Sequence, residues 1–389
     1  MKVLQIIPHY RPAYQYGGPI FSVHNLSKGM VERGVEVTVW TTNLGLKHRK
    51  DILLGEEVLI DGVRVYYFPI IGSFHYSLSP ALMKYMKDRI RDFDVVHIQG
   101  VYQFHSFVGG YYARKYEIPY VLTPRGMLIP ELIKMKGRLK KKIYISLVER
   151  KNVEKADLVH CTTEIERNEL LNLGLNPKKT VVIPNSAELE ECNEFSMRES
   201  FRKKYDLFGK TIILFFSRLN WKKGIDLLIP AFAKVVSRHP DAHLVFVGPD
   251  LEGYRRKIEV WIKENGIEEH VTFTGLLTGS EKLVALKESD IFVLPSYSEN
   301  FGIAVVEAML SKLPVIISKE VGIWNVVKEN NCGMIVDLTP KSIAEGILHL
   351  LKNPEERLKM GERGKETAKR EFSIDNIAEK MIQAYNDII

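Results

Sequence analysis

The chain has 389 residues, of which 45% are hydrophobic and 26% are charged. This composition is typical of folded globular proteins and excludes disordered and fibrous classes. The length is too great for one core of ordinary size and predicts two domains. The 55 Lys and Arg residues outnumber the 48 Asp and Glu residues, which gives a net charge of +7. This favours an anionic partner: a nucleotide, a phosphate, an anionic lipid or a nucleic acid.

The three cysteines, Cys161, Cys192 and Cys332, are too far apart for a Cys-x-x-Cys metal site or a disulfide framework. The apolar start, Met1–Pro8, is too short for a signal peptide and predicts a buried first strand. No run of about twenty apolar residues is present, so we expect no membrane-spanning helix. We therefore expect a cytoplasmic protein, placed at most at the inner face of a membrane.

Short runs of β-branched residues alternate with helix-like segments along the whole chain. In the first half, strands are predicted at 3–7, 36–40, 95–98, 120–122 and 181–183. In the second half they are predicted at 211–216, 243–247, 271–274, 291–294, 315–317 and 334–336, with helices at 224–237, 251–264, 280–288, 302–311 and 340–351. The alternation predicts an α/β fold in which helices cover parallel sheets.

A polar segment, Pro184–Ser196, follows the last strand of the first half without opening an amphipathic helix. We place the domain boundary there and expect an N-terminal domain over 1–190 and a C-terminal domain over 191–372. Two more helices are predicted at 354–371 and 373–389, and we expect the last one to pack back on the first domain. In such a fold, ligands bind in a cleft at the carboxyl ends of the strands.

The densest chemical pattern runs from Leu294 to Met309. Glu299 lies in the loop after a predicted strand, and Glu307 lies inside the almost wholly apolar helix that follows. Burial of Glu307 is costly unless donors such as ribose hydroxyls satisfy its carboxylate. Glu299 stands just before a helix start, where sugar hydroxyls can lie beside phosphates. The alternatives are a solvent-facing cap for Glu299 and a structural ion pair for Glu307.

A second pattern combines two cations. Arg218 follows a predicted strand and Lys223 lies at the start of the next helix, so two positive side chains and a helix dipole converge. Such a group can hold a pyrophosphate without a metal and stabilise a departing nucleoside diphosphate. The alternatives are a surface ion pair for Arg218 and, for Lys222, a solvated side chain, which we favour.

The loop after the first strand contains two adjacent glycines, Gly17 and Gly18, before Pro19. They allow the backbone to approach a ligand closely, or they form a tight turn. A third loop, Asp92–Asp94, matches an Asp-x-Asp pattern that can hold a divalent cation. It precedes the strand 95–98 and therefore lies at the wrong end of the sheet, so we predict neither a metal nor a cofactor.

The strand at 95–98 leads toward the expected cleft. His97 and His105 are the histidines best placed for this cleft, although a satisfied core position is favoured for His97. Gln99 stands just past the strand.

Taken together, these residues resemble the retaining glycosyltransferases of family four (glycosyl transferases group 1), which have the GT-B fold of two Rossmann-like domains. The resemblance spans essentially the whole chain and is strongest from Arg218 to Ser318. It implies that Glu299 contacts the donor sugar and Glu307 the nucleotide ribose. The implied diphosphate site combines two cations with backbone amides: Arg218, Lys223, Phe301, Gly302 and Ile303. Gly17 and Gly18 would close over the donor phosphates or the acceptor.

The resemblance also implies a metal-independent transfer in which the acceptor attacks from the face that the nucleotide leaves. Many members carry His-x-His where this chain has His97-Ile98-Gln99. Gln99 cannot relay a proton, so its catalytic role is open and His105 is a candidate substitute. Relatives with the pattern of Thr123–Met127 often act in surface-glycan assembly. We therefore expect transfer of a hexose-type sugar from a UDP- or GDP-sugar to a glycan or lipid-linked acceptor.

A basic segment continues into an amphipathic one over 133–148. We expect it either to rest on anionic lipid or a lipid-diphosphate acceptor, or to pack on the first sheet with a solvated basic end. Nucleic acid is disfavoured because the basic residues are not interleaved with aromatic ones on a recognisable module. Two other functions stay open: a nucleotide-sugar epimerase that needs no acceptor, and an inactive nucleotide-sugar-binding protein. The sequence does not indicate an oligomeric state.

Overall fold

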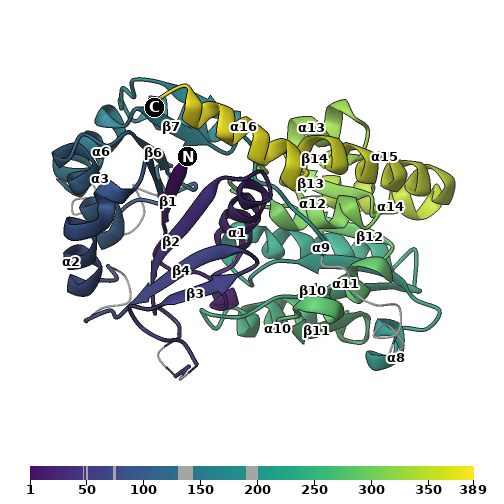
Figure 1. Cartoon of the computed structure of the whole chain (residues 1–389). Helices are drawn as coiled ribbons and strands as arrows, with labels where there is room; N and C mark the ends of the chain where they lie inside the picture. The colour runs from purple at the N-terminus through teal and green to yellow at the C-terminus, as the bar shows by residue number, and fades with distance from the viewer. Residues whose placement is uncertain (47, 50, 73–75, 130–142, 190–199) are drawn as a thin grey trace. The chain divides into compact units, whose positions relative to one another are not determined.

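Figure 1 shows the chain as a computed structural model, which describes all residues except 47, 50, 73–75, 130–142 and 190–199. The chain divides into two compact units. The first unit comprises Met1–Ser186 together with Ile374–Ile389, and the second comprises Ala187–Ser373. The junction after Ser186 lies in the polar segment that begins at Pro184.

The first unit is built around an eight-stranded sheet with the order β3-β4-β2-β1-β5-β6-β7-β8. Its strands are β1 (Lys2–Ile6), β2 (Glu36–Thr42), β3 (Glu57–Ile60), β4 (Val63–Phe68), β5 (Val95–Gln99), β6 (Tyr120–Thr123), β7 (Leu158–Cys161) and β8 (Thr180–Val182). All neighbours pair in parallel except β3 and β4, which are antiparallel. The predictions of β1, β2, β5, β6 and β8 are confirmed, whereas β3, β4 and β7 are not predicted from the sequence.

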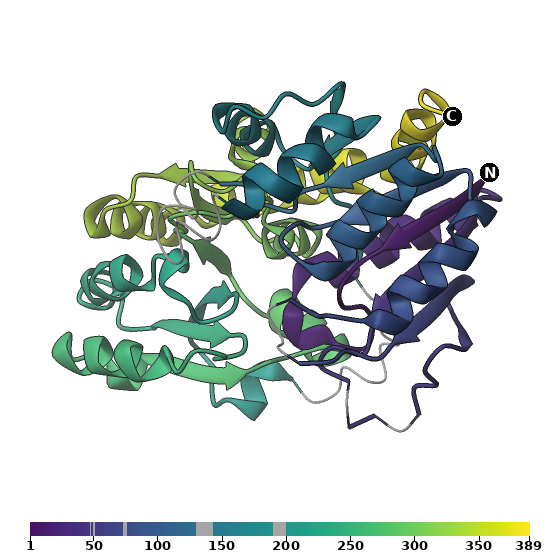
Figure 2. The same ribbon diagram turned by 90° about the vertical axis from the view of Figure 1, so that its left-hand side faces the viewer.

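Helices cover both faces of this sheet (Figures 1 and 2). Within the described residues, the helices of the unit are α1 (Gly18–Val31), α2 (Pro80–Arg89), α3 (Phe104–Lys115), α6 (Arg150–Lys155), α7 (Glu164–Asn172) and α16 (Ile374–Asn386), with two short 3₁₀ helices, η1 (Tyr14–Tyr16) and η2 (Ile90–Asp92), and a π-helix, η3 (Ile145–Glu149). Because successive strand residues point to opposite faces, Val3 packs in the core under α1 and α16, and Leu4 packs in the core under α2 and α3.

The last helix of the chain, α16, belongs to the first unit and packs against α1. A Cβ at Gly29 of α1 would lie 2.5 Å from Cγ2 of Ile374, so this glycine permits the close approach of the two helices. Arg33 adds an ion pair with Asp375 at 2.7 Å. The chain thus returns to its first sheet after completing the second unit.

The second unit contains a six-stranded, wholly parallel sheet with the order β11-β10-β9-β12-β13-β14. The strands are β9 (Thr211–Phe216), β10 (Ala242–Val247), β11 (Val271–Gly275), β12 (Ile291–Leu294), β13 (Val315–Ser318) and β14 (Gly333–Val336). The helices are α8 (Phe201–Lys204), α9 (Ile225–Val236), α10 (Arg255–Glu264), α11 (Gly279–Lys287), α12 (Ile303–Leu310), α13 (Trp324–Glu329), α14 (Pro340–Lys352) and α15 (Pro354–Phe372), with turns η5 (Trp221–Lys223) and η6 (Glu268–His270). All six predicted strands of this unit are confirmed.

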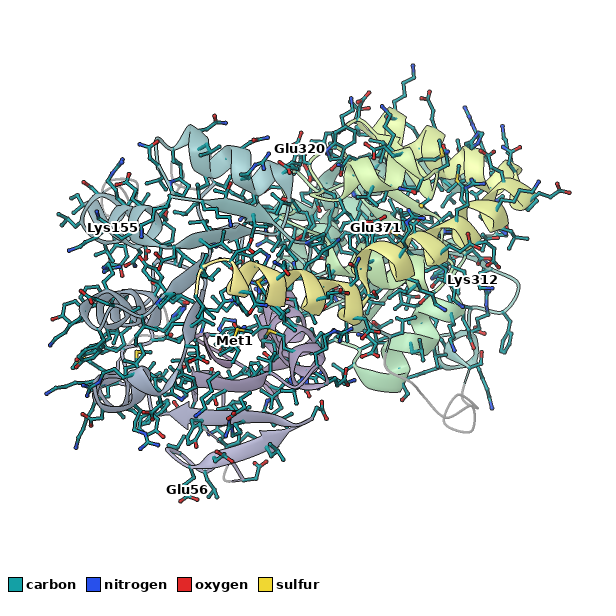
Figure 3. The ribbon with its side chains drawn as sticks, turned by 45° about the horizontal axis from the view of Figure 1, so that its top comes forward. Met1, Glu56, Lys155, Lys312, Glu320 and Glu371 are labelled. Carbon is teal, nitrogen blue, oxygen red and sulfur yellow. The ribbon has the colours of Figure 1, made fainter. Side chains whose placement is uncertain are left out.

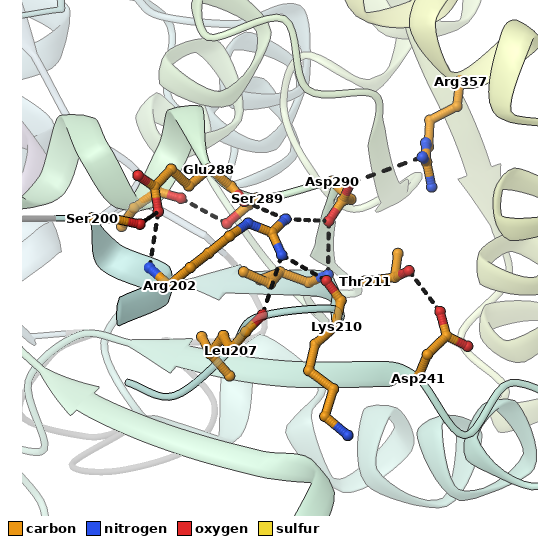
Figure 4. A network of polar contacts seen from close by, with 12 residues as sticks. Ser200, Arg202, Leu207, Lys210, Thr211, Asp241, Glu288, Ser289, Asp290 and Arg357 are labelled. Atoms are coloured by element: carbon orange, nitrogen blue, oxygen red, sulfur yellow. Dashed lines mark hydrogen bonds and ion pairs between the residues drawn. The ribbon is translucent and has the colours of Figure 1, made fainter. Parts of the chain in front are cut away.

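A polar network fixes the amino edge of the second sheet (Figure 4). Asp290, which precedes β12, accepts hydrogen bonds from the backbone N–H of Ile212 at 2.8 Å and from Arg202 at 2.9 Å. Arg202 also donates to the carbonyls of Lys210 and Glu288. These contacts tie α8 and the loop after it to the sheet. The opposite, carboxyl edge is left for ligands.

Charged side chains lie at the surface of each unit. The labelled side chains of Glu56, Lys155, Lys312 and Glu320 in Figure 3 are exposed, whereas most strand residues are buried and apolar. Within the described parts of the chain, no helix combines the length and the apolar character needed to cross a bilayer.

Candidate active site

Two loops at the carboxyl edge of the second sheet are joined through a glycine. The backbone of Gly224 is left-handed, with φ of 65°, and a Cβ there would lie 1.9 Å from the carbonyl oxygen of Pro295. Only glycine allows this approach. The N–H of Tyr297 also donates to the carbonyl of Lys222 at 2.7 Å. The loop after β9 is therefore fixed against the loop after β12, which carries Glu299.

Lys223 and Glu299 lie together, and the ammonium of Lys223 donates a hydrogen bond to the carboxylate of Glu299. The lysine side chain is 10% exposed and the glutamate side chain 23%. The backbone of Glu299 is held as well, because its N–H donates to the carbonyl of Glu320 and its carbonyl accepts from the N–H of Gly322, both at 2.9 Å. Glu299 is thus a fixed, ion-paired side chain and not a solvent-facing cap.

Arg218 lies two residues beyond β9 and is exposed. It has no hydrogen bond or ion pair with any residue that the structure describes. The backbone beside it is fixed: a Cβ at Gly248 would lie 2.0 Å from the carbonyl oxygen of Ser217, and the N–H of Leu219 donates to Pro249 at 3.0 Å. The predicted alternative of a surface ion pair for Arg218 is therefore not formed within the described parts of the chain.

The start of α12 adds backbone donors to this edge. Gly302 precedes the helix with φ of 98°, and no side chain caps the N-terminus. The first N–H groups of a helix have no partner within it, so those beginning at Ile303 can face an anion. Phe301 is buried and packs edge-on against Phe372 with ring centroids 5.6 Å apart. The predicted residues 301–303 thus form a rigid helix start beside Glu299.

Glu307 is buried in α12, as its apolar surroundings predict, and is 7% exposed. Its carboxylate accepts a hydrogen bond from Lys282 of α11 at 3.0 Å. The structural ion pair considered for Glu307 is therefore present. Lys282 is not predicted from the sequence, although a lysine immediately before the apolar run Leu283–Leu286 is a recognisable signal.

Two family comparisons cover nearly the whole chain. Residues 16–191 match Glycosyltransferase Family 4, and residues 197–367 match the glycosyl transferases group 1. The chain belongs to glycosyltransferase family 4. It is therefore an enzyme that transfers glycosyl groups.

Relatives agree with this family. An uncharacterised glycosyltransferase of Methanocaldococcus jannaschii is 27% identical over 398 residues, which cover 99% of this chain and 98% of the relative. A D-inositol 3-phosphate glycosyltransferase of Corynebacterium glutamicum is 30% identical over 256 residues, covering 62% of this chain and 60% of the relative.

Solved structures show the fold. HepE from Anabaena, in complex with UDP and glucose, has a TM-score of 0.79 at 20% identity, with 100% of both chains covered. WaaG, a glycosyltransferase involved in lipopolysaccharide biosynthesis, has a TM-score of 0.72 at 17% identity, with 99% of both chains covered. The family 4 enzyme described here thus has the predicted GT-B fold of two Rossmann-like parts.

In the first unit of the glycosyltransferase, the glycine pair forms the start of α1. Gly17 is the N-cap with φ of 85°, and Gly18 is the first helical residue, followed by Pro19. A Cβ at Gly17 would meet no atom within 4 Å. The left-handed backbone, and not crowding, is therefore what requires glycine at this position.

Gln99 and His105 are both buried at the end of β5 and the start of α3. The side-chain amide of Gln99 donates to Gln5 at 2.8 Å and accepts from Arg125 at 2.9 Å. Nε2 of His105 lies 2.8 Å from the carbonyl oxygen of Gln99. Burial lowers the pKa of His105 to about 4, so its ring is neutral at pH 7. Gln5 and Arg125, which hold the Gln99 side chain, are not predicted from the sequence.

His97 is a satisfied core histidine, as predicted. It is fully buried, and its two ring nitrogens lie 2.7 Å from the hydroxyls of Tyr385 and Thr123. Tyr385 comes from α16, far away in sequence, which is why the pattern around β5 does not reveal it.

The Asp-x-Asp loop lies before β5, at the amino edge of the first sheet, as predicted. Asp94 accepts a hydrogen bond from the backbone N–H of Lys2 at 2.6 Å, and Asp92 pairs with Arg89 at 3.0 Å. Both carboxylates therefore have local partners.

The predicted lipid-facing segment 133–148 lies only partly within the described residues, which resume at Ile143. Ile143 and Leu147 are 50% and 73% exposed. Two apolar side chains therefore face solvent directly after the basic stretch.

Proposed function

We propose that this glycosyltransferase moves a hexose-type sugar from a UDP- or GDP-sugar to a glycan or lipid-linked acceptor, with retention of configuration and without a metal. The observation that carries the proposal is the cluster at the carboxyl edge of the second sheet: an exposed Arg218, the pair of Lys223 and Glu299, and the uncapped start of α12. Cations and backbone donors at the same edge of a sheet suit a diphosphate.

Each group has a distinct role in the proposed donor complex. Arg218 binds the diphosphate with its guanidinium. Lys223 has three N–H donors, so its ammonium can hold a phosphate oxygen while it keeps Glu299 in place. Glu299 accepts hydrogen bonds from the hydroxyls of the donor sugar, and Glu307 accepts them from the ribose. The amides of Phe301, Gly302 and Ile303 complete the phosphate contacts.

In the proposed reaction, the acceptor hydroxyl attacks the anomeric carbon on the face from which the nucleotide leaves. The bond between that carbon and the phosphate oxygen breaks, and the departing phosphate takes the proton of the acceptor hydroxyl. The cations stabilise the charge that develops on the leaving group. Gln99 has no basic atom and the ring of His105 is buried, so we assign to both the role of shaping the carboxyl edge of the first sheet. The backbone of Gly17 and Gly18 would approach the ligand closely at the same edge.

The comparisons support this proposal at two points. HepE holds UDP and glucose in its crystals, which fits a nucleotide-sugar donor. WaaG takes part in lipopolysaccharide biosynthesis, which fits a role in surface polysaccharide synthesis.

Titration calorimetry against UDP, GDP and their sugar conjugates tests the donor. We expect one nucleotide to bind, and the variant Arg218→Ala/Lys223→Ala to lose that binding. Turnover of the best donor with lipid-linked acceptors tests the transfer. NMR of the anomeric proton of the product tests whether the configuration is retained. An enzyme that binds no nucleoside diphosphate, or a double variant that binds it unchanged, would overturn the proposal. Turnover of the donor without an acceptor would indicate the epimerase instead.

A further inference from the structure

A buried ion pair lies on the two helices that follow β11 and β12. Lys282 is the fourth residue of α11, and its ammonium donates to Oε1 of Glu307 at 3.0 Å. The side chain of Lys282 is 10% exposed and that of Glu307 is 9% exposed. The pair therefore links two βα units that follow one another along the chain.

The fold itself gives little reason for this pair. Its neighbours on both helices are buried apolar residues: Leu283, Val284, Ala285, Leu286, Val305, Val306, Ala308 and Met309. Removing two charges from water costs about as much as their attraction returns, and a well-packed apolar pair would serve at least as well. The retained charges therefore point to a ligand.

The geometry shows which atom is available. Lys282 binds Oε1 of Glu307, and no residue in the described parts of the chain donates to Oε2. Glu307 is the fifth residue of α12, the helix whose uncapped start lies beside Glu299. An ammonium on one oxygen fixes the carboxylate and balances its charge. The other oxygen is then suited to neutral hydroxyl donors and not to a further cation.

We propose that Lys282 is a positioning residue for the nucleotide ribose: it orients Glu307 so that Oε2 accepts hydrogen bonds from the ribose hydroxyls. This inference rests on the proposed function, because it requires a nucleotide donor. Lys282 itself touches no part of the ligand.

The experiment compares ribonucleotides with their 2′-deoxy counterparts. Dissociation constants of UDP and 2′-deoxy-UDP, and of GDP and 2′-deoxy-GDP, are measured by calorimetry. For the nucleotide that the wild type binds, we expect the 2′-deoxy form to bind about 10-fold more weakly or worse, the usual effect of losing a hydrogen bond to a charged group. In Lys282→Met, which keeps the length of the side chain, we expect the ratio of the two dissociation constants, 2′-deoxy form to ribonucleotide, to fall below about 3-fold.

Lys287→Met provides the matched control, since Lys287 is an exposed lysine on the same helix; its ratio should equal that of the wild type. If Lys282→Met does not fold, Lys282→Gln is measured in its place. A folded Lys282 variant with the ratio of the wild type would overturn the inference, because a merely structural lysine would weaken both nucleotides equally.

Two further outcomes separate this inference from the proposed function. If the wild type binds a nucleotide but Glu307→Gln keeps the full ratio, Glu307 does not contact the ribose and the inference fails while the diphosphate site stands. If the wild type binds neither UDP nor GDP, the proposed function itself fails.

Discussion

The ammonium of Lys223 donates a hydrogen bond to the carboxylate of Glu299, a residue 76 positions further along the chain. The contact joins the loop after β9 to the loop after β12. It places a cation with two further donors at the edge where Arg218 is exposed. A group that is already held in place needs little reorganisation when charge develops on a leaving diphosphate.

We expect Arg218→Ala and Lys223→Ala each to lower kcat/KM by about 10²- to 10³-fold, equivalent to about 3–4 kcal/mol, the usual loss when one fixed donor to developing charge is removed. Initial rates with saturating acceptor measure the effect. Lys222→Ala is the matched control, because it removes the neighbouring lysine side chain and keeps the backbone carbonyl that accepts from Tyr297. Activity that survives both substitutions would refute the diphosphate assignment.

The contact between Gly224 and Pro295 leads to a stability prediction. In Gly224→Ala the new methyl group meets the carbonyl oxygen of Pro295 at 1.9 Å, so the two loops must separate. We expect a loss of about 2–4 kcal/mol in the free energy of unfolding and a large loss of activity. Gly209→Ala is the control, because Gly209 has a similar φ of 71° with nothing within 4 Å of a Cβ. Equal destabilisation of the two variants, measured by thermal unfolding, would show that backbone strain alone is responsible.

Much of the second unit could be predicted from its sequence. Buried parallel strands such as β9 and β12 are continuous apolar runs, and the candidate site residues lie in the loops that directly follow these strands. Glu299 and Lys223 were therefore expected at one sheet edge, and the structure brings them into contact. An ion pair of Glu307 is one of the alternatives that the sequence allows, but its partner on α11 cannot be predicted, because periodicity does not show which helices are neighbours.

The first unit was harder to predict for physical reasons. The hairpin of β3 and β4 lies at the edge of the sheet, and along most of each strand the more buried residues alternate with less buried ones, so neither strand is a fully buried run. The strand β7 has only four residues, Leu158–Cys161, and contains a histidine. The partners of Gln99 and His97 come from β1, from the loop after β6 and from α16. Such long-range polar contacts depend on the topology and leave no local pattern.

Removal of metal ions should leave transfer unchanged. The charge of the diphosphate is balanced by Arg218 and Lys223 in the proposed complex, so no divalent cation is needed. Initial rates are compared before and after dialysis against EDTA. The variant Asp92→Asn, which alters the Asp-x-Asp loop, is measured in parallel and should have the rate of the wild type. A loss of activity that Mg²⁺ or Mn²⁺ restores would contradict the prediction.

Contact with lipid is tested at the segment that ends near Leu147. Ile143 and Leu147 are exposed, and exposed apolar side chains beside basic ones favour an anionic surface. We expect the enzyme to sediment with phosphatidylserine vesicles at low salt, less so at high salt, and several-fold less in Leu147→Glu. Phosphatidylcholine vesicles are the control. Protein that stays in the supernatant in every case would favour the alternative, in which the basic end is simply solvated.

A chain of buried hydrogen bonds makes the stability of the first unit depend on pH. His160 Nε2 lies 2.7 Å from the carbonyl of Ile183 and therefore donates to it, so its Nδ1 accepts from the hydroxyl of Thr123 at 2.9 Å. The Thr123 oxygen in turn accepts from His97 Nε2, and His97 Nδ1 accepts from Tyr385. The two links in which Nδ1 accepts a hydrogen bond require neutral rings. A proton on Nδ1 of either ring would oppose a hydroxyl that already donates.

Burial lowers the pKa of His160 to about 3 and lowers that of His97 well below its usual value. In the unfolded chain both titrate near pH 6.5, so between that pH and the folded pKa the unfolded state binds more protons and stability rises with pH. Acidification from about pH 6 to pH 4 should therefore reduce the free energy of unfolding by about 1.4 kcal/mol per pH unit for each histidine. Native-state hydrogen exchange of the β5 amides measures this free energy.

The variant His160→Gln isolates one of these contributions, because an amide can donate to Ile183 and accept from Thr123 but does not take up a proton in this range. The slope of its free energy of unfolding against pH should be smaller than that of the wild type by about 1.4 kcal/mol per pH unit between pH 6 and pH 4. His48→Gln, which removes an exposed histidine, is the matched control. If His160→Gln has the slope of the wild type, His160 is protonated in the folded enzyme as readily as in the unfolded chain, and the direction of the hydrogen-bond chain is wrong.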